Sequence, residues 1–160
     1  MAYNRNMYNH APTDYDCPLC HIAKGEDTER GNQEETVVFR NDLVTAFIAG
    51  RFQRSDPGHV IVIPNEHFEN IYDMPEEYGH AVFDAAKKVA IAFKEVYESD
   101  GVSTMQHNEP AGNQDAFHYH FHVFPRTKGD EIYANQKDSY WATQEEKIPY
   151  AEKLRAYFAK

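Results

Sequence analysis

The chain has 160 residues, of which 41% are hydrophobic and 26% charged, a composition typical of a soluble globular protein with one buried core. Its 16 basic and 26 acidic side chains leave a net charge of −10, which argues against a nucleic-acid partner because such proteins need a basic face. There is no signal-peptide-like start and no apolar run of membrane-spanning length, so we expect a cytoplasmic protein without a membrane partner.

Residues 1–16 are rich in Asn, Tyr and Asp and show no periodicity, which predicts a poorly ordered N-terminal extension. Residues 17–160 are then expected to form a single domain. This domain begins with Cys17-Pro-Leu-Cys20 and a polar run that contains two glycines. Such a run indicates a surface loop with room for a short helical turn.

Three strands are predicted next, on runs of β-branched and aromatic residues. Residues 36–40 and 43–48 would form a hairpin, because the Asn-Asp pair between them is a turn signal. Residues 50–58 are mostly polar, which is typical of a loop. Residues 59–64 predict a buried strand that ends at a proline.

The middle of the chain carries a helical pattern. We expect a short helix over residues 65–72 and a longer one that begins at Asp73 as its N-cap, with Pro75 in the first turn and Glu76 in the capping-box position. Steps of four and three residues place an apolar stripe along the long helix: Val82, Ala86, Val89, Phe93 and Val96. Asp100-Gly101 would end this helix.

The last part of the chain adds two strands and a helix. Residues 102–107 and 117–125 predict strands, with a polar loop over 108–115 between them and another loop from 126 to 140. Thr143 with Glu146 marks the start of an amphipathic C-terminal helix. Together these elements predict an α+β fold, in which an antiparallel sheet packs one face on the long helix.

The strand at residues 117–125 reads Phe-His-Tyr-His-Phe-His-Val-Phe-Pro, so His118, His120 and His122 alternate with large apolar residues. Successive strand side chains point to opposite faces, and the three imidazoles therefore share one face. A face that needs only solubility would use Lys, Glu or Thr, so this one indicates a metal site or phosphate chemistry. The alternative is a solvent-facing strand that happens to carry three histidines.

Cys17 and Cys20 are the only cysteines, and their spacing can supply two thiolates to a tetrahedral zinc site. Two more ligands must then come from elsewhere in the chain. Two free cysteines in a loop are the alternative. A thioredoxin-like redox role is disfavoured, because no strand precedes Cys17.

Four segments of the chain, in order over residues 17–126, resemble the histidine triad (HIT) superfamily of nucleotide hydrolases and transferases. Residues 118–124 resemble its His-x-His-x-His signature, and residues 57–67 its Gly-His strand and Ile-Pro-x-x-His corner. Residues 108–115 resemble its loop before the triad, and Cys17-Pro-Leu-Cys20 the motif of bacterial zinc-carrying members. The resemblance implies a HIT-like fold, a small nucleotide partner with a purine base, and a homodimer.

The resemblance also implies catalytic roles. His120 would attack the α-phosphorus of a small nucleoside phosphate derivative and form a covalent nucleotidyl-histidine, while its other nitrogen donates to a backbone carbonyl of the same strand. His122 would assist the leaving group, and His59 would line the same pocket. Asn108 and Gln114 would bind the phosphates together with His120 and His122.

In zinc-carrying members the two remaining ligands are the histidine of the Ile-Pro corner and the first triad histidine, which are His67 and His118 here. Four protein ligands make a closed site, so this zinc would be structural and would support the catalytic strand. His59 is a rival for the third position, and the sequence leaves both open.

Two positions depart from the family pattern. No acidic residue follows Ala46-Phe47-Ile48, where many members grip the ribose, and Asp115 follows Gln114 where a small or hydroxyl residue is more usual. Three alternative functions remain open. They are a dinucleoside polyphosphate hydrolase, a nucleotide-binding module without turnover, and a protein with a catalytic metal on all three triad histidines. A dimer contact through the helix at 76–99 would be typical of the family, although its stripe could equally be core.

Overall fold

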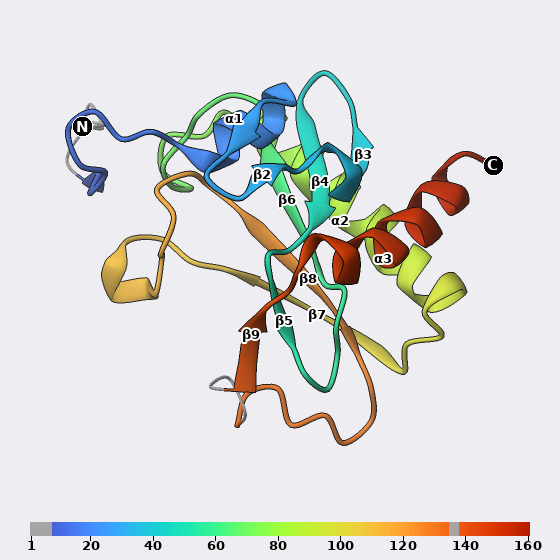
Figure 1. Ribbon diagram of the computed structural model, residues 1–160. Helices are drawn as coiled ribbons and strands as arrows, with labels where there is room; N and C mark the ends of the chain where they lie inside the picture. The colour runs from blue at the N-terminus through green and yellow to red at the C-terminus, as the bar shows by residue number, and fades with distance from the viewer. Residues whose placement is uncertain (1–7, 135–137) are drawn as a thin grey trace.

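The computed structural model describes residues 8–134 and 138–160 (Figure 1). The helices of this described part are α1 (Pro18–Lys24), α2 (Glu76–Val96) and α3 (Gln144–Phe158). Its strands are β1 (Asp27–Thr28), β2 (Gly31–Asn32), β3 (Val37–Arg40), β4 (Val44–Ile48), β5 (Arg51–Gln53), β6 (Val60–Pro64), β7 (Gly101–Gln106), β8 (Phe121–Arg126) and β9 (Ser139–Trp141). Of the predicted extension, residues 1–7 lie outside the described residues.

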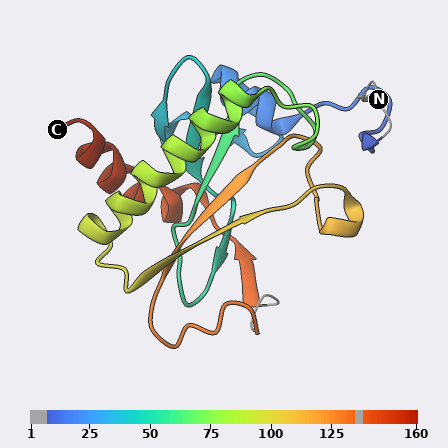
Figure 2. The ribbon, with the colours of Figure 1, turned by 180° about the vertical axis from the view of Figure 1, so that it is seen from behind.

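The main sheet has the strand order β3-β4-β6-β8-β7, and every neighbouring pair is antiparallel. The predicted β3–β4 hairpin is present, and its turn is held by Asn41, whose Oδ1 accepts from the amides of Leu43 (2.9 Å) and Val44 (2.8 Å). Helix α2 lies across one face of the sheet (Figure 2). The predicted α+β fold is therefore confirmed.

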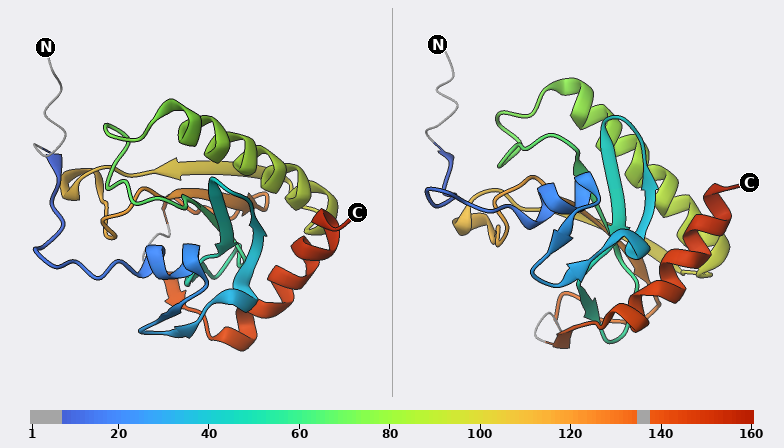
Figure 3. Two further views of the ribbon diagram at one scale, coloured as in Figure 1. Left: turned by 90° about the horizontal axis from the view of Figure 1, so that it is seen from above. Right: turned by 45° about the horizontal axis from the view of Figure 1, so that its top comes forward.

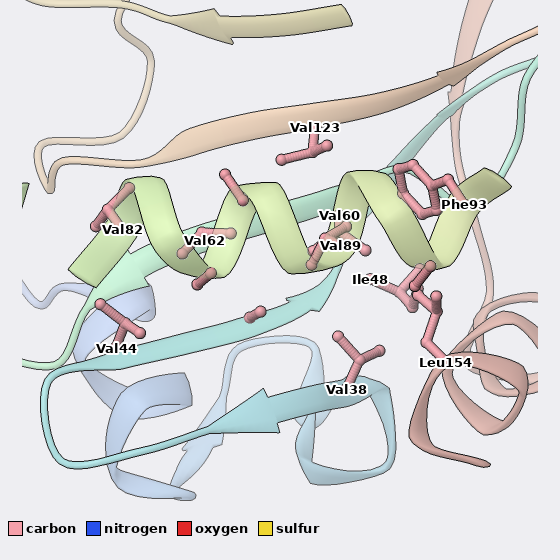
Figure 4. Packing of buried hydrophobic residues seen from close by; sticks show 14 of the residues in the cluster. Val38, Val44, Ile48, Val60, Val62, Val82, Val89, Phe93, Val123 and Leu154 are labelled. Atoms are coloured by element: carbon pink, nitrogen blue, oxygen red, sulfur yellow. The ribbon is translucent and has the colours of Figure 1, made fainter. Parts of the chain in front are cut away.

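The core lies between this face of the sheet and α2. The predicted stripe on α2 is buried up to Phe93, with Val89 and Phe93 fully inaccessible, and Val96 at its end is partly buried. It packs with apolar residues of the strands such as Val62 and with Leu154 of α3 (Figure 4). Burying each such side chain stabilises the fold by roughly 1.5–3 kcal/mol. The stripe thus belongs to the core and is not free for a dimer contact.

The opposite face of the sheet carries α1 (Figure 3), whereas Phe52 of β5 and Tyr140 of β9 pack against the core on the α2 side. The strands β5 and β9 pair antiparallel, which corrects the prediction that residues 50–58 and 126–140 are loops throughout. Phe52 explains the ribbon of β5 and β9, because its ring is 1% exposed and meets Tyr140 and Tyr150 edge-on, at ring-centroid distances of 6.1 and 5.5 Å. Neither tyrosine is near Phe52 in sequence, so local pattern could not predict the pairing.

Residues 65–72 form no helix, contrary to the prediction. The Phe68 carbonyl accepts from the Tyr119 amide (2.6 Å), and the Ile71 amide donates to Oδ1 of Asn108 (2.8 Å). Because these backbone groups bond to distant segments, they are not available for an i to i+4 ladder. The segment instead fastens the corner after β6 to the loop that precedes the histidines.

Three predicted boundaries were also wrong. Helix α2 begins at Glu76 after Pro75, so Asp73 is not its N-cap, and it ends at Val96 because Glu98 adopts a positive φ of 55°. Strand β8 begins at Phe121 and not at 117, because the amides of His118 and Tyr119 donate to carbonyls outside the ladder. The capping box of Thr143 and Glu146 at the start of α3 is confirmed. None of the helices in the described ranges is long and apolar enough to cross a membrane.

Candidate active site and metal centre

The alternating histidines face away from α2. His122 pairs with Ile61 of β6, and directly paired residues share a face of the sheet. Ile61 packs against the smaller apolar cluster around α1, whereas Tyr119 lies in the α2 core. The alternation predicted from the sequence therefore separates His118, His120 and His122 from the apolar side chains between them.

His120 is held in one tautomer by the backbone. Its Nδ1 lies 2.8 Å from the carbonyl oxygen of His118, and a carbonyl only accepts, so Nδ1 carries the proton. This is the hydrogen bond that the family resemblance implies. The ring is 3% exposed, and burial lowers the pKa of His120 below 6.5. A neutral ring in this tautomer keeps a lone pair on Nε2, which is the form that can attack phosphorus.

His122 and His59 lie beside His120. The His120 and His122 rings are 5.0 Å apart between centroids, and Nδ1 of His122 lies 3.4 Å from Nε2 of His59. The His59 ring stacks on Phe124 at 4.2 Å. Burial lowers the pKa of His59 to about 3 and that of His122 well below 6.5, so both rings are neutral at pH 7.

Cys17, Cys20, His67 and His118 come together at the other end of this row. One ligand atom from each lies within 4.8 Å of all the others. Nδ1 of His118 is 3.4 Å from both sulfur atoms, and Nδ1 of His67 is 3.3 Å from that of Cys20. Tetrahedral zinc with typical bond lengths separates a thiolate sulfur from an imidazole nitrogen by about 3.6 Å. The residues therefore fit zinc, and His59, the rival third ligand, lies instead beside His122.

His118 connects this cluster to His120. Its Nε2 lies 3.0 Å from the Pro64 carbonyl, which can only accept, so Nδ1 keeps the lone pair that points at the thiols. Its own carbonyl oxygen holds His120. Burial lowers the pKa of His118 to about 3, so the ring is in the neutral form that binds metal. Because the His118 carbonyl bonds to the His120 ring, any displacement of His118 would also displace His120.

The segment before Cys17 also contacts the site. The Tyr15 hydroxyl accepts from the Phe117 amide (3.3 Å), and the two rings meet edge-on at 5.6 Å. Farther upstream, the amides of His10 and Ala11 donate to the buried carboxylate of Glu69. These contacts join residues 58 to 102 positions apart in the sequence, and no local pattern signals them.

The side chains of Asn108 and Gln114 form hydrogen bonds that hold the loop at residues 108–115 in place. Asn108 accepts from the Ile71 amide, while the Gln114 amide group donates to the Glu69 carbonyl and accepts from the Glu109 amide (2.6 Å). These bonds fix the loop before the triad. A phosphate-binding role for the two side chains stays a prediction.

Two further residues approach the histidines. Oδ1 of Asp115 lies 3.8 Å from Nε2 of His120, although the Asp115 side chain is 85% exposed. The His107 ring lies edge-on to His122 at a centroid distance of 6.2 Å. From the sequence, Asp115 is notable only because it departs from the family pattern, which usually has a small or hydroxyl residue there. His107 is predicted only as the last residue of the strand at 102–107.

Comparison with known proteins agrees with this geometry. A family model described as HIT domain matches residues 30–129. Protein hit of Bacillus subtilis is 33% identical over 115 residues, which is 71% of this chain and 74% of that protein. The chain belongs to the HIT family.

Solved HIT structures have the same fold. A HIT-like protein of Bartonella henselae matches with a TM-score of 0.75 at 30% identity, over 92% of this chain and 98% of that one. A zinc-bound histidine triad family protein of Mycobacterium smegmatis matches with a TM-score of 0.73 at 23% identity, over 90% of this chain and 94% of that one.

Some HIT relatives have a named activity. An adenosine 5′-monophosphoramidase of Saccharomyces cerevisiae is 31% identical over 74 residues, which is 46% of this chain and 44% of that protein. Hydrolases of nucleotide derivatives thus occur among the HIT proteins that this chain resembles.

Proposed function

We propose that this HIT protein hydrolyses or transfers a nucleoside monophosphate from a small phosphoramidate, ester or anhydride, through a covalent nucleotidyl-His120. The hydrogen bond from Nδ1 of His120 to the His118 carbonyl carries the proposal, because it leaves a neutral Nε2 free to react. The named activity of the yeast relative supports a nucleoside phosphoramidate as one substrate.

The reaction has two displacements at phosphorus. Nε2 of His120 attacks the α-phosphorus, and the leaving group departs with the electron pair of its bond to phosphorus and takes up a proton. Water then attacks the same phosphorus and gives up one proton, which replaces the proton that the leaving group took up. The P–N bond breaks, and its electron pair returns to His120, which releases a nucleoside monophosphate. An alcohol or amine acceptor in place of water would make the enzyme a transferase.

His59 would orient His122 for this reaction. Of their two facing nitrogens, one must donate and the other accept. The Nδ1 atom of His59 is buried without a partner among the described residues, and a buried lone pair is the less costly orphan than a buried N–H. His59 Nε2–H then donates to His122, whose Nε2–H is left to donate to the phosphate or leaving group. Such a donor contributes about 10²-fold in rate.

We propose a structural zinc on Cys17, Cys20, His67 and His118. Four protein ligands leave no open position, so zinc would hold the N-terminal segment and His118 in place and would take no part in the reaction. The two cysteines must stay reduced to bind it, which suits the cytoplasm.

A homodimer is also part of the proposal. Phe83 and Ile91 lie on α2 and are 66% and 46% exposed, and β7 is an edge strand of the sheet next to this helix. Exposed apolar side chains of this size on a helix suit contact with a second copy of the chain.

Trapping the covalent intermediate tests the proposed function. The wild type is mixed with adenosine 5′-phosphoramidate, quenched in alkali within one turnover, and weighed by mass spectrometry. We expect an adenylyl adduct on the wild type, none on His120→Ala, and an unchanged yield with the control His80→Ala, which alters an exposed ring on α2. Tight nucleotide binding without adduct or turnover would favour a binding module instead.

A panel of substrates separates the alternatives within the enzyme class. A dinucleoside polyphosphate hydrolase would turn over diadenosine triphosphate faster than the phosphoramidate. A catalytic metal on the triad histidines would make chelators abolish the rate while the fold persists. The proposed structural zinc predicts the reverse, since chelation should lower stability before it lowers the rate.

A further inference from the structure

Asp115 lies at the edge of the candidate active site, and its side chain makes no hydrogen bond with the residues that the structure describes. Among the described residues, the polar side-chain atom that the structure places within 4 Å of this carboxylate is Nε2 of the neutral His120 ring, 3.8 Å away. That nitrogen has no proton to donate in the tautomer fixed by the His118 carbonyl. The carboxylate therefore faces the space that a reacting phosphate must enter.

The backbone on either side keeps Asp115 in this place. The Gln114 amide donates to the Glu109 carbonyl (3.1 Å), and the Gln114 side chain is buried on the same loop. On the other side, the Ala116 carbonyl accepts from the His118 amide (2.9 Å). The Asp115 side chain is exposed, but its backbone is held between two residues whose backbone groups are hydrogen-bonded.

We infer that Asp115 selects substrates by the charge of the leaving group, admitting amines and neutral alcohols and opposing polyanions. This inference rests on the proposed function. In a reactive complex the phosphorus lies about 3–3.5 Å from Nε2 of His120. The carboxylate lies 3.8 Å from the same nitrogen, so it is at most about 7 Å from the phosphorus at which the bond to the leaving group breaks. A phosphate-type leaving group departs with added negative charge, whereas an amine departs neutral or protonated.

The size of the effect follows from Coulomb's law. The carboxylate is largely in water, so the effective dielectric constant is closer to that of water than to that of an interior, and each negative charge about 5 Å away costs roughly five- to tenfold in rate. A nucleoside diphosphate leaving group should therefore be disfavoured by about tenfold or more relative to an amine. This repulsion is screened when salt shortens the Debye length to about 3 Å at 1 M.

The test compares two substrates that share the adenosine and the α-phosphorus: adenosine 5′-phosphoramidate and diadenosine triphosphate. The quantity measured is the ratio of their kcat/KM values, amidate over anhydride, in the wild type and three variants. Asp115→Asn removes the charge and keeps the shape, while Asp115→Glu keeps the charge. Asp84→Asn is the matched control, because it makes the same charge change at an exposed position of α2.

We expect the ratio to fall about tenfold in Asp115→Asn, mainly through faster anhydride cleavage, and to stay within about twofold of the wild type in Asp115→Glu and Asp84→Asn. High salt should lower the ratio in the wild type and leave that of Asp115→Asn unchanged. An unchanged ratio in Asp115→Asn, or an equal fall in Asp84→Asn, would overturn the inference while the proposed function stands. A wild type that cleaves neither substrate and forms no adduct would overturn the proposed function, and the inference with it.

Discussion

Acidification should destabilise this protein through His59, and the structure sets the size of the effect. The ring is 5% exposed, stacks on Phe124 and faces another imidazole, His122, so it has no counter-ion for a positive charge. Burial lowers its pKa in the folded chain from 6.5 to about 3. Between these two values the unfolded chain binds the proton and the folded chain does not. Stability from this group is therefore complete above about pH 6.5 and is lost as the pH falls toward 3.

For one such histidine, the free energy of unfolding should fall by about 2 kcal/mol between pH 7 and pH 5. His59→Phe keeps an aromatic ring for Phe124 and cannot be protonated. The substitution itself lowers the free energy of unfolding at pH 7. Between pH 7 and pH 5, however, the free energy of unfolding should fall by about 2 kcal/mol less in the variant than in the wild type.

Urea unfolding of both proteins at pH 7 and pH 5, followed by far-ultraviolet circular dichroism, measures this difference. Protonation of the metal ligands affects both proteins alike and cancels in the comparison. His80→Gln controls for the loss of a histidine from an exposed position. If wild type and His59→Phe lose the same stability between the two pH values, the ring is not held neutral by burial and the reasoning fails.

Three further outcomes are expected. Cys17→Ser should reduce bound zinc from about one ion per chain to a small fraction, as measured by plasma mass spectrometry. It should also lower the free energy of unfolding by several kcal/mol. Full zinc content in this variant would contradict the proposed site. Gly58→Ala should destabilise the fold by about 2–3 kcal/mol in urea unfolding, because Gly58 has a φ of +84° and an added Cβ would lie 2.4 Å from the Tyr150 ring. Phe83→Lys should convert a dimer to a monomer in analytical ultracentrifugation without changing the circular dichroism spectrum, and a wild type that sediments as a monomer at micromolar concentration would refute the α2 contact.

The elements with strong local patterns were predictable from the sequence. The four- and three-residue steps along α2, the Asn-Asp turn of the first hairpin and the Thr143 capping box each depend on neighbours within a few residues. The same holds for the alternation that separates the imidazoles from the core side chains. These features express backbone geometry, which acts at short range.

The errors occur where distant segments meet. Residues 65–72 have a helical composition, yet their backbone bonds to Asn108 and Tyr119, and these long-range bonds outweigh a weak local propensity. The β5–β9 ribbon exists because Phe52 finds two tyrosines of the C-terminal part. Such contacts depend on packing, and no window of the sequence contains both partners.

For the site, the sequence by itself determined which residue types were available: a row of three imidazoles on one strand face and a closely spaced pair of cysteines. Only the tertiary structure decided between His67 and His59 at the cysteines, fixed the tautomer of His120 through a carbonyl, and brought Asp115 to the reactive nitrogen. The physical reason is that metal geometry, proton position and Coulomb energy all depend on distances of a few ångströms. Those distances are set by how the segments pack, and not by their order along the chain.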